Sequence, residues 1–462
     1  MGSIVASGAL KVPKDHHKLQ GIINNLTFIN PFEPNKNFIA YFISPEYLVI
    51  PRGYPLTDEV DSSKLIKSHC DFETAQSYNL RDYQEVAVGE IITHLAGNDY
   101  GQLLLSAGTG SGKTTSLAGV LVGVHRRTLI LSHLTMLSTQ MFKEMTKNLP
   151  DASIKILEAS DHDKQLPDVA IATFQLLNSS KKLLDSCKAY YGMVIVDEAD
   201  NSFTSSRLKV LFTLMPQYQL YLTATPTKDL MKQTQGLNYL FGNKVVEMEQ
   251  PTETVIHSRH LFLDYSHLTW QSPGNTNMYK TSLGKFILRS SIPSDIARMC
   301  RELKENNVKG TFWIIADLNA VQDKLEELLV AQGLTVGIIR GTTSQKKRQV
   351  ILEAIHLDRM NILIGSAPLS AGISIPELSI GIRLMPNSSS EELLEQQKGR
   401  LKRFIEWKTT QSPLWIDFRI SGNLEYSAKK RWKLYQETTH GVTMCKPHEV
   451  MDKIKGLIYD KQ

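Results

Sequence analysis

The chain has 462 residues, of which 42% are hydrophobic and 21% are charged. This balance is typical of a globular protein and excludes the disordered and fibrous classes, while the length predicts about three structural units. The formal net charge of +5 is compatible with a phosphate-backbone partner but does not require one.

The chain contains no apolar run of the roughly 18 residues that a membrane span needs, and its start lacks the basic region of a secretory signal. We therefore expect a cytoplasmic protein that does not contact membranes. The four cysteines are far apart, and no cysteine and histidine spacing resembles a zinc site. We expect reduced thiols and no transition metal.

Residues 1–77 differ in composition from the rest of the chain. The short apolar strings FIAYFI and YLVI stand among segments rich in Pro, Asn and Gly, such as NPFEPNKN and IPRGYP. Such punctuated apolar runs favour short strands. The sequence predicts a small β-containing accessory domain here.

Residues 78–254 alternate short apolar runs with longer amphipathic segments, which predicts βα units around a parallel sheet. The predicted strands are QLLLS, TLILS, DVAIAT, MVIVD and LYLTA. A second series over residues 255–425 contains TFWIIA, TVGIIR, NILIGS, IGIRLM and PLWIDF. We predict two α/β lobes joined near the polar PTET run, followed by a basic helical tail over residues 426–462 that contains KKRWK.

The string AGTGSGKTT, which ends at Thr115, follows the first predicted strand and precedes an apolar helix. In such a loop backbone amides face a β-phosphate, Lys113 reaches the β and γ oxygens, and Thr114 offers its hydroxyl to Mg²⁺. The nucleotide-binding residues predicted here are Gly108, Thr109, Gly110, Ser111, Gly112, Lys113, Thr114 and Thr115. The alternative is a glycine-rich turn that binds no nucleotide.

The run MVIVDEAD ends a predicted buried strand with Asp197 and Glu198. Asp197 is suited to hold Mg²⁺ and Glu198 to orient and deprotonate an attacking water. A solvated acidic turn is the alternative. Further along, QQKGRLKR places Arg400 and Arg403 on one face of a predicted helix, for which a solvated basic helix is the alternative.

The order of these motifs from Leu80 to Arg403, with TATP between them, resembles the superfamily 2 helicases. The resemblance implies an α/β fold of two tandem RecA-like domains that uses ATP and Mg²⁺. It implies that Arg400 and Arg403 act as arginine fingers, and that Thr223 and Thr225 couple the nucleotide state to the contact between the lobes. The implied nucleotide contacts outside the phosphate loop are Arg81 and Gln84 in NLRDYQ, Gly372 in SAGISIPEL, and Gln396.

The strings SHLTMLSTQ, TATP and QQKGRLKR resemble the DNA-acting branch around RecG, XPB and the restriction translocases. Within it, the short chain, the GISI string and the basic tail look most similar to the phage UvsW-type branch-migration helicases. This likeness implies forked or branched DNA as the partner, a role in phage replication or recombination, and a bacterial or phage-infected cytoplasm. The residues expected to contact nucleic acid are Ser132, Gln140, Thr173, Gln175, Thr342 and Arg348.

Two other functions remain open at this point. One is an RNA helicase or a transcript-displacing translocase. The other is a nucleotide-switched nucleic-acid-binding protein with little turnover, although the presence of Glu198, Arg400 and Arg403 favours a motor.

Overall fold

The computed structural model describes residues 3–28, 38–108, 111–133, 135–199, 204–223, 239, 241–242, 244–249, 258–274, 276–365, 375–384, 391–402, 405–438 and 440–459. The chain divides into two compact units, Met1–Pro251 and Thr252–Gln462. The division falls in the polar run where the sequence predicts the linker.

The first unit is built on a seven-stranded sheet in the order β10-β11-β9-β12-β13-β8-β14, and all of its strand pairs are parallel. The five predicted strands are present. The strands are β8 (Gly101–Ala107), β9 (Thr128–Ser132), β10 (Ile154–Ile156), β11 (Val169–Thr173), β12 (Met193–Val196), β13 (Tyr218–Thr223) and β14 (Val245–Met248). The short outer strands β10 and β14 were not predicted.

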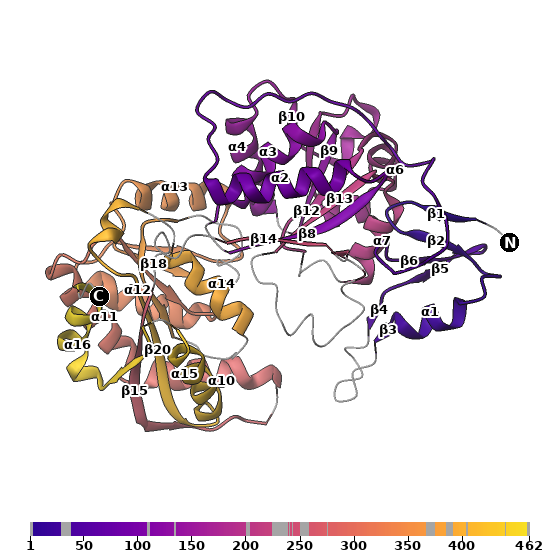
Figure 1. The fold of residues 1–462 in the computed structure, drawn as a ribbon. Coiled ribbons are helices and arrows are strands. Elements are labelled where there is room, and N and C mark those ends of the chain that lie inside the picture. The colour runs from indigo at the N-terminus through magenta and orange to yellow at the C-terminus, as the bar shows by residue number, and fades with distance from the viewer. Residues whose placement is uncertain are drawn as a thin grey trace. The chain divides into compact units, whose positions relative to one another are not determined.

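Alternate side chains of these strands enter two separate apolar cores. In β8, Leu103 and Leu105 pack with one group of helices, whereas Leu104 packs with the other. The first group is α2 (Asp82–Ala96), α3 (Lys113–Val124) and α4 (Thr135–Asn148), and the second is α5 (Phe174–Ser179), α6 (Lys181–Tyr190) and α7 (Ser205–Thr213) (Figure 1). Burial on both faces explains why these strands read as continuous apolar runs. The prediction of a helix-flanked parallel sheet is confirmed.

A five-stranded sheet, in the order β5-β6-β2-β1-β7, precedes this lobe and confirms the predicted small N-terminal β structure. It is antiparallel except for the parallel pair of β1 and β7. Its strands are β1 (Ile4–Ala6), β2 (Leu10–Pro13), β5 (Phe42–Ile43), β6 (Tyr47–Ile50) and β7 (Val60–Asp61), with the helix α1 (Leu19–Asn25) and the separate pair β3 (Thr27–Phe28) and β4 (Phe38–Ile39) beside them.

A buried arginine joins this N-terminal sheet to the lobe. The Arg52 guanidinium donates to the carbonyl of Ser7 in the turn between β1 and β2, and to the carbonyls of Gln217 (3.0 Å) and Pro216 (2.7 Å) just before β13. Burial lowers the pKa of Arg52 to about 10, so the group stays charged at neutral pH. Nearby, a Cβ at Gly8 would lie 1.8 Å from the Leu211 carbonyl oxygen, so only glycine fits there. The N-terminal sheet is therefore a fixed part of the first unit.

The second unit has its own seven-stranded parallel sheet, in the order β17-β18-β16-β19-β20-β15-β21. Its strands are β15 (Arg259–Trp270), β16 (Thr311–Ile315), β17 (Val336–Ile339), β18 (Ile362–Gly365), β19 (Leu378–Arg383), β20 (Leu414–Gly422) and β21 (Thr443–Cys445). The helices are α10 (Thr276–Arg289), α11 (Ile292–Glu305), α12 (Asn319–Ala331), α13 (Gln345–His356), α14 (Glu391–Leu401), α15 (Glu425–Gln436) and α16 (Val450–Tyr459). This second sheet confirms the tandem α/β architecture.

The expectation of a basic helical tail over residues 426–462 is only partly right. The helices α15 and α16 lie in this region, but Thr443–Cys445 forms the edge strand β21 beside β15. Within KKRWK, Arg431 is fully buried and its Nε lies 2.7 Å from Asp417 Oδ2. The side chain of Tyr435 donates to the same carboxylate at 3.0 Å. The composition predicts that Arg431 lies at the surface, but a buried carboxylate such as that of Asp417 needs a paired cation. The segment that contains Arg431 is therefore part of the core of the second unit.

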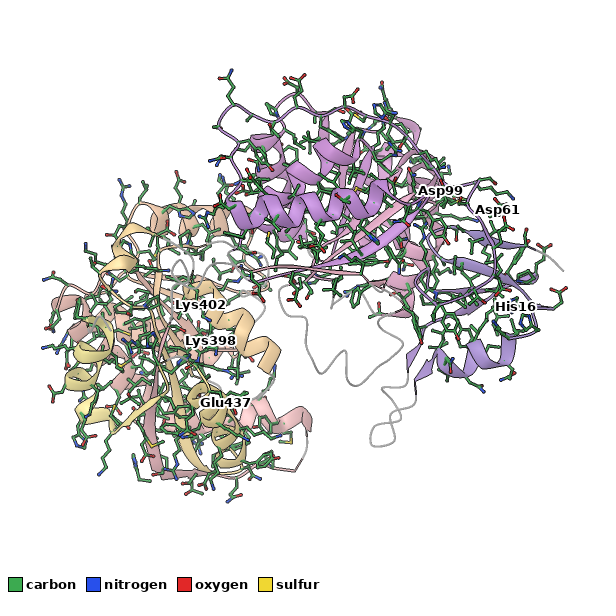
Figure 2. The ribbon with its side chains drawn as sticks, viewed as in Figure 1. His16, Asp61, Asp99, Lys398, Lys402 and Glu437 are labelled. Atoms are coloured by element: carbon green, nitrogen blue, oxygen red, sulfur yellow. The ribbon has the colours of Figure 1, made fainter. Side chains whose placement is uncertain are left out.

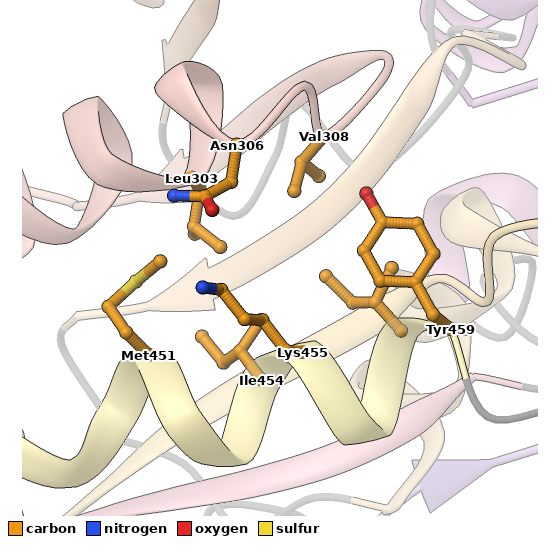
Figure 3. A pocket seen from close by; sticks show the side chains of 8 residues that line it. Leu303, Asn306, Val308, Met451, Ile454, Lys455 and Tyr459 are labelled. Atoms are coloured by element: carbon orange, nitrogen blue, oxygen red, sulfur yellow. The ribbon is translucent and has the colours of Figure 1, made fainter.

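A cavity of about 290 Å³ lies between α11 and α16. Figure 3 shows side chains of α16 facing those of α11 across it, with the Lys455 ammonium, the Asn306 amide and the Tyr459 hydroxyl as the polar groups of an otherwise apolar lining. It is a packing gap beneath the last helix. Among the described residues, no helix is both long and apolar enough to cross a membrane.

The buried Arg52 contacts lead to a prediction about stability. We expect Arg52→Ala to lower the free energy of unfolding by about 3 kcal/mol, because the carbonyls of Ser7, Pro216 and Gln217 lose their donor in a buried site. Urea-induced unfolding of the full chain followed by circular dichroism measures this change. Substitution of the exposed Lys14 by alanine should change the unfolding free energy by less than about 0.5 kcal/mol. Equal changes in unfolding free energy for the two substitutions would contradict the conclusion that Arg52 joins the N-terminal sheet to the lobe.

Candidate nucleotide site

The carboxyl ends of the central strands of the first unit lie at one edge of its sheet. The register pairs Thr223 with Ser106, Val196 with Leu131, and Thr173 with Ser132. The segments that follow these strands therefore begin at the same level, which is where open parallel sheets bind ligands. The phosphate loop, the Asp197 and Glu198 pair and Thr223 all lie at this edge.

The phosphate loop leads directly into α3. Gly112 caps this helix with φ of 84°, a left-handed conformation that favours glycine. A Cβ at Gly112 would also lie 2.2 Å from Gln84 Nε2. The Lys113 ammonium donates to the Ala107 carbonyl at 2.8 Å across the loop. Thr109 and Gly110 lie outside the described residues.

This loop fits a phosphate group in three respects. The first amides of α3 have no intrahelical acceptor and carry the positive end of the helix dipole. A Cβ at Gly108 would meet no atom within 4 Å, so the backbone there is open to an approaching group. The Ser111 hydroxyl is buried without a hydrogen-bond partner in the described part of the chain. Thr114 and Thr115 lie in the first turn of α3.

The start of α2 braces the loop from one side. Gln84 Nε2 donates to the Ser111 carbonyl at 2.7 Å, while its Oε1 accepts the Arg81 amide at 2.9 Å. The Tyr83 hydroxyl donates to the same Ser111 carbonyl at 3.1 Å, and Arg81 Nη1 donates to the Tyr83 oxygen at 3.0 Å. The predicted residues Arg81 and Gln84 thus lie against the phosphate loop. The Gln84 side chain therefore links the phosphate loop, through its Nε2, to the start of α2, through its Oε1.

Tyr78 is a second brace that the sequence did not reveal. Its hydroxyl donates to the Thr115 carbonyl at 3.1 Å, within the first turns of α3. Burial raises the pKa of Tyr78 to about 12, so the phenol remains protonated and able to donate at neutral pH. Its position immediately before NLRDYQ carries no motif that would have identified this contact.

Asp197 and Glu198 follow β12 in an unusual backbone conformation. The Glu198 amide donates to Asp197 Oδ1 at 3.1 Å, which orients the carboxylate. Glu198 has φ of 49°, a left-handed value that costs free energy for a residue with a side chain. Such strain persists where the surroundings fix the conformation, and it clusters at functional sites. The two carboxylates are therefore held in separate, defined directions.

His133 approaches Glu198 from the end of the neighbouring strand β9. His133 Nε2 lies 3.6 Å from Glu198 Oε2, and both side chains are largely buried. No role was predicted for His133 beyond its place in the string SHLTMLSTQ, and this contact was not predicted. Its adjacency to Glu198 depends on the pairing of β9 with β12, which a local pattern does not reveal.

In the second unit, α14 carries the predicted arginine motif. Arg400 lies near the end of this helix and is 8% exposed. The neighbouring Lys398, which Figure 2 labels, is buried with its ammonium 5.1 Å from the centre of the Tyr435 ring. Four predictions, namely Gly372, Arg403, Thr225 and the side chain of Gln396, fall outside the described residues.

The positions predicted to contact nucleic acid differ in exposure. Gln175 and Thr342 are exposed, whereas Gln140 is half-buried. The Ser132 hydroxyl is buried and hydrogen-bonded to Ser138 at 2.8 Å, and the Thr173 hydroxyl caps α5 by accepting the Leu176 amide at 3.2 Å.

Arg348 shapes the turn that contains Thr342. Its guanidinium donates to the carbonyls of Thr343 at 2.9 Å and Arg340 at 2.8 Å. The turn ends at Ser344, which caps α13. Arg348 thereby fixes an exposed loop whose tip carries Thr342.

Two family models match separate parts of the chain. "Type III restriction enzyme, res subunit" matches residues 77–228 and "Helicase conserved C-terminal domain" matches residues 294–405. Among solved structures, S. cerevisiae Dbp5 bound to RNA and ADP BeF3 superposes with a TM-score of 0.55 at 15% identity, covering 82% of this chain and 97% of that one. At this identity the likeness concerns the fold, which is that of tandem RecA-like domains.

Several curated relatives are helicases. The putative DNA 3'-5' helicase Rad25 of Haloarcula marismortui is 22% identical over 76% of this chain and 54% of its own length. The DNA 3'-5' helicase XPB of Kineococcus radiotolerans is 24% identical over 70% of this chain and 57% of its own length. The putative helicase 109L of invertebrate iridescent virus 3 is 30% identical over 32% of this chain and 46% of its own length. The chain thus spans about half the length of these relatives. The chain is thus similar to helicases in these relatives and in residues 294–405, and its fold is that of tandem RecA-like domains.

Proposed function

We propose that this chain is an ATP-dependent DNA helicase or translocase. The observation that carries the proposal is the meeting of the phosphate loop, Asp197 and Glu198 at the carboxyl edge of one parallel sheet. Phosphoryl transfer requires a cradle for the phosphates, a metal ion and a group that positions water, and these residues supply the matching chemistry.

Each residue has a separate role in the proposed reaction. Lys113 and the first amides of α3 would bind the phosphates, while Thr114 and Asp197 would hold Mg²⁺, which would supply charge neutralisation there. Glu198 orients the attacking water and accepts its proton. His133 lies beside Glu198 and acts on it as a positioning residue. Gln84 and Arg81 position the loop and line the side on which the adenine is expected.

The second unit is proposed to complete the catalytic set. Arg400 and Arg403 would stabilise the charge that develops on the transferred phosphoryl group, with Gln396 and Gly372 as further nucleotide contacts. Thr223 and Thr225 would couple hydrolysis to movement of the units. Thr223 is suited to this role because it ends β13 at the same level as Ser106 before the phosphate loop.

A motor is favoured over a nucleotide-switched binding protein that hardly turns over. A switch needs phosphate contacts only, whereas Glu198 has no role in binding phosphate. The left-handed backbone of Glu198 costs free energy, and a protein that does not hydrolyse ATP would have no use for the carboxylate that this conformation directs.

The catalytic assignment predicts different defects for two substitutions. Lys113→Ala should abolish both ATP binding and hydrolysis, because it removes a phosphate contact. Glu198→Gln should retain ATP binding and lower kcat by at least about 100-fold, because only the proton acceptor is lost. Fluorescent-nucleotide binding and steady-state hydrolysis separate the two effects. Wild-type turnover by either variant would rule out the assignment.

The bracing of the phosphate loop predicts a change in nucleotide affinity. Gln84→Ala removes the 2.7 Å hydrogen bond to the Ser111 carbonyl and should raise the KM for ATP by about tenfold, or about 1.4 kcal/mol. The neighbouring exposed Glu85 provides a matched control, and Glu85→Ala should leave KM unchanged. An unchanged KM in Gln84→Ala would show that the loop keeps its shape without this brace.

DNA is the favoured polymer, and junction DNA the favoured form of it. Two of the relatives are named as DNA helicases, and the sequence motifs resemble the branch-migration enzymes. In the first unit the proposed contacts are the exposed Gln175, the half-buried Gln140 and the backbone near Ser132 and Thr173, and in the second unit they are Thr342 and Arg348. Contacts of this kind hold the phosphate backbone without reading bases.

A basic cluster on the first unit is suited to hold the additional arms of a junction. Lys11 and Lys64 belong to the N-terminal region and Lys188 to α6. Burial first, and then the neighbouring ammonium groups of Lys188 and Lys64, hold the pKa of Lys11 below its usual range. Three ammonium groups gathered in this way attract a phosphate backbone.

We predict that forks and four-way junctions stimulate hydrolysis more than linear duplex or single-stranded RNA does, and that labelled junctions are migrated with ATP. The triple variant Lys11→Ser, Lys64→Ser and Lys188→Ser should lower the ratio of junction-stimulated to duplex-stimulated hydrolysis by about tenfold. Basal hydrolysis should be kept, because the catalytic residues are unchanged. The control with the same change in charge is the triple variant Lys285→Ser, Lys324→Ser and Lys453→Ser in the second unit, which should keep the preference for junctions. Activity confined to RNA duplexes would favour the RNA helicase alternative, and junction migration that ignores ATP would rule out the motor on DNA.

A further inference from the structure

We propose that His69, Asp71 and His125 form a binding site for a divalent transition-metal ion of the zinc class. The site lies outside the nucleotide-binding residues and does not depend on the proposed ATPase activity. It joins the segment between β7 and α2 to the end of α3.

The three side chains converge on one small volume. His69 Nε2 lies 3.0 Å from Asp71 Oδ1, and His125 Nδ1 lies 3.1 Å from the same oxygen. One ligand atom from each residue lies within 4.8 Å of the other two. Two ligands bonded at about 2.0–2.1 Å to a tetrahedral ion are about 3.3 Å apart, so small side-chain movements suffice to admit the ion.

Backbone pairing holds this arrangement in place. His69 forms an antiparallel bridge with Arg126. The Cys70 amide donates to the His125 carbonyl at 3.2 Å, and the Arg127 amide donates to the Ser68 carbonyl at 3.1 Å. The two imidazole rings are stacked with centroids 5.5 Å apart. The ligands thus come from two chain segments that are already fixed to each other.

The donor set determines the class of ion. Two imidazole nitrogens and one carboxylate suit Zn²⁺ or Ni²⁺ rather than Mg²⁺, which prefers oxygen ligands. Three protein ligands leave one coordination position for water. No hydrogen bond within the described ranges engages His69 Nδ1 or His125 Nε2, so each ring can carry its proton there and present the other nitrogen to the ion.

The surrounding charges are compatible with a bound cation. His125 is the C-cap of α3, where the helix dipole favours positive charge. The arginines adjoining His125 are hydrogen-bonded: Arg126 Nε donates to Gln217 and its Nη1 to the His125 carbonyl, while Arg127 Nε donates to Asp168. The Asp71 carboxylate supplies the negative charge within the cluster.

A second cluster, His16, His17 and Asp58, is less suited to bind metal. His16, labelled in Figure 2, accepts the Lys18 amide at its Nδ1. A neutral ring then carries its proton on Nε2, the atom that faces Asp58 at 3.5 Å. That nitrogen has no lone pair to offer, so this cluster serves as the internal comparison.

The proposed ion would link the N-terminal region to the helix that begins at the phosphate loop. His69 and Asp71 lie on the connection from β7, while His125 ends α3, whose first residue is Lys113. Binding only to the folded arrangement would stabilise the first unit.

The test uses the full chain, freed of metal with a chelator and titrated with Zn²⁺ in a calorimeter. We expect one ion per chain and a rise in the melting temperature of the first unit. Both His125→Asn and Asp71→Asn should weaken binding at least about tenfold and abolish the thermal shift. Asparagine is chosen at His125 because it tolerates the left-handed backbone, where φ is 53°.

His16→Asn is the matched control and should leave binding unchanged. If His125→Asn fails to fold, His69→Asn tests the same site from an exposed position. Failure to bind Zn²⁺, binding that survives both His125→Asn and Asp71→Asn, or binding lost in His16→Asn would overturn the proposal.

Discussion

The site of the first unit depends on one constraint, the parallel pairing of β8 with β13 and of β12 with β9 and β13. Parallel strands with aligned registers place their carboxyl ends at a single edge, so the loops that follow them meet there. The phosphate loop and the Asp197 and Glu198 pair are separated by more than eighty residues of chain. They meet only because both sheet faces are covered by helices that return the chain to the opposite edge. Catalytic proximity is thus a consequence of burying two apolar faces.

The contacts that refine this edge are polar and buried. Gln84 and Tyr83 fix one carbonyl of the phosphate loop, and Tyr78 fixes another in α3. Arg52 likewise forms buried hydrogen bonds at the opposite end of β13. Its guanidinium donates to backbone carbonyls of both the N-terminal region and the lobe. A buried polar group is costly unless it is hydrogen-bonded, so each of these contacts penalises alternative arrangements more than it stabilises the native one.

The sequence predicted those features that local patterns encode. Ten predicted strands, the phosphate loop before α3 and the carboxylates after β12 all follow from apolar runs and from residues adjacent in the chain. It did not predict that Arg431 is buried against Asp417, because composition assigns a KKRWK run to solvent. Nor did it pair His133 with Glu198, or His125 with His69 and Asp71, since these contacts depend on which strands and segments become neighbours. The periodicity of apolar residues predicts helices and strands, but it does not predict which distant segments of the chain become neighbours.

The second unit holds its arginine helix by an equally rigid arrangement. The ammonium of Lys398 in α14 lies over the Tyr435 ring, and Tyr435 is fixed by hydrogen bonds with Asp417 and with Trp415. The Lys408 ammonium donates to the Leu401 carbonyl at 2.6 Å, at the end of the same helix. Arg400 is therefore carried on an element whose position is fixed within its own unit. Close-packed interiors of this kind resist continuous deformation, so a mechanical cycle is accommodated most easily by moving whole units. The contacts described in each unit thus direct the charged groups of that unit from within it.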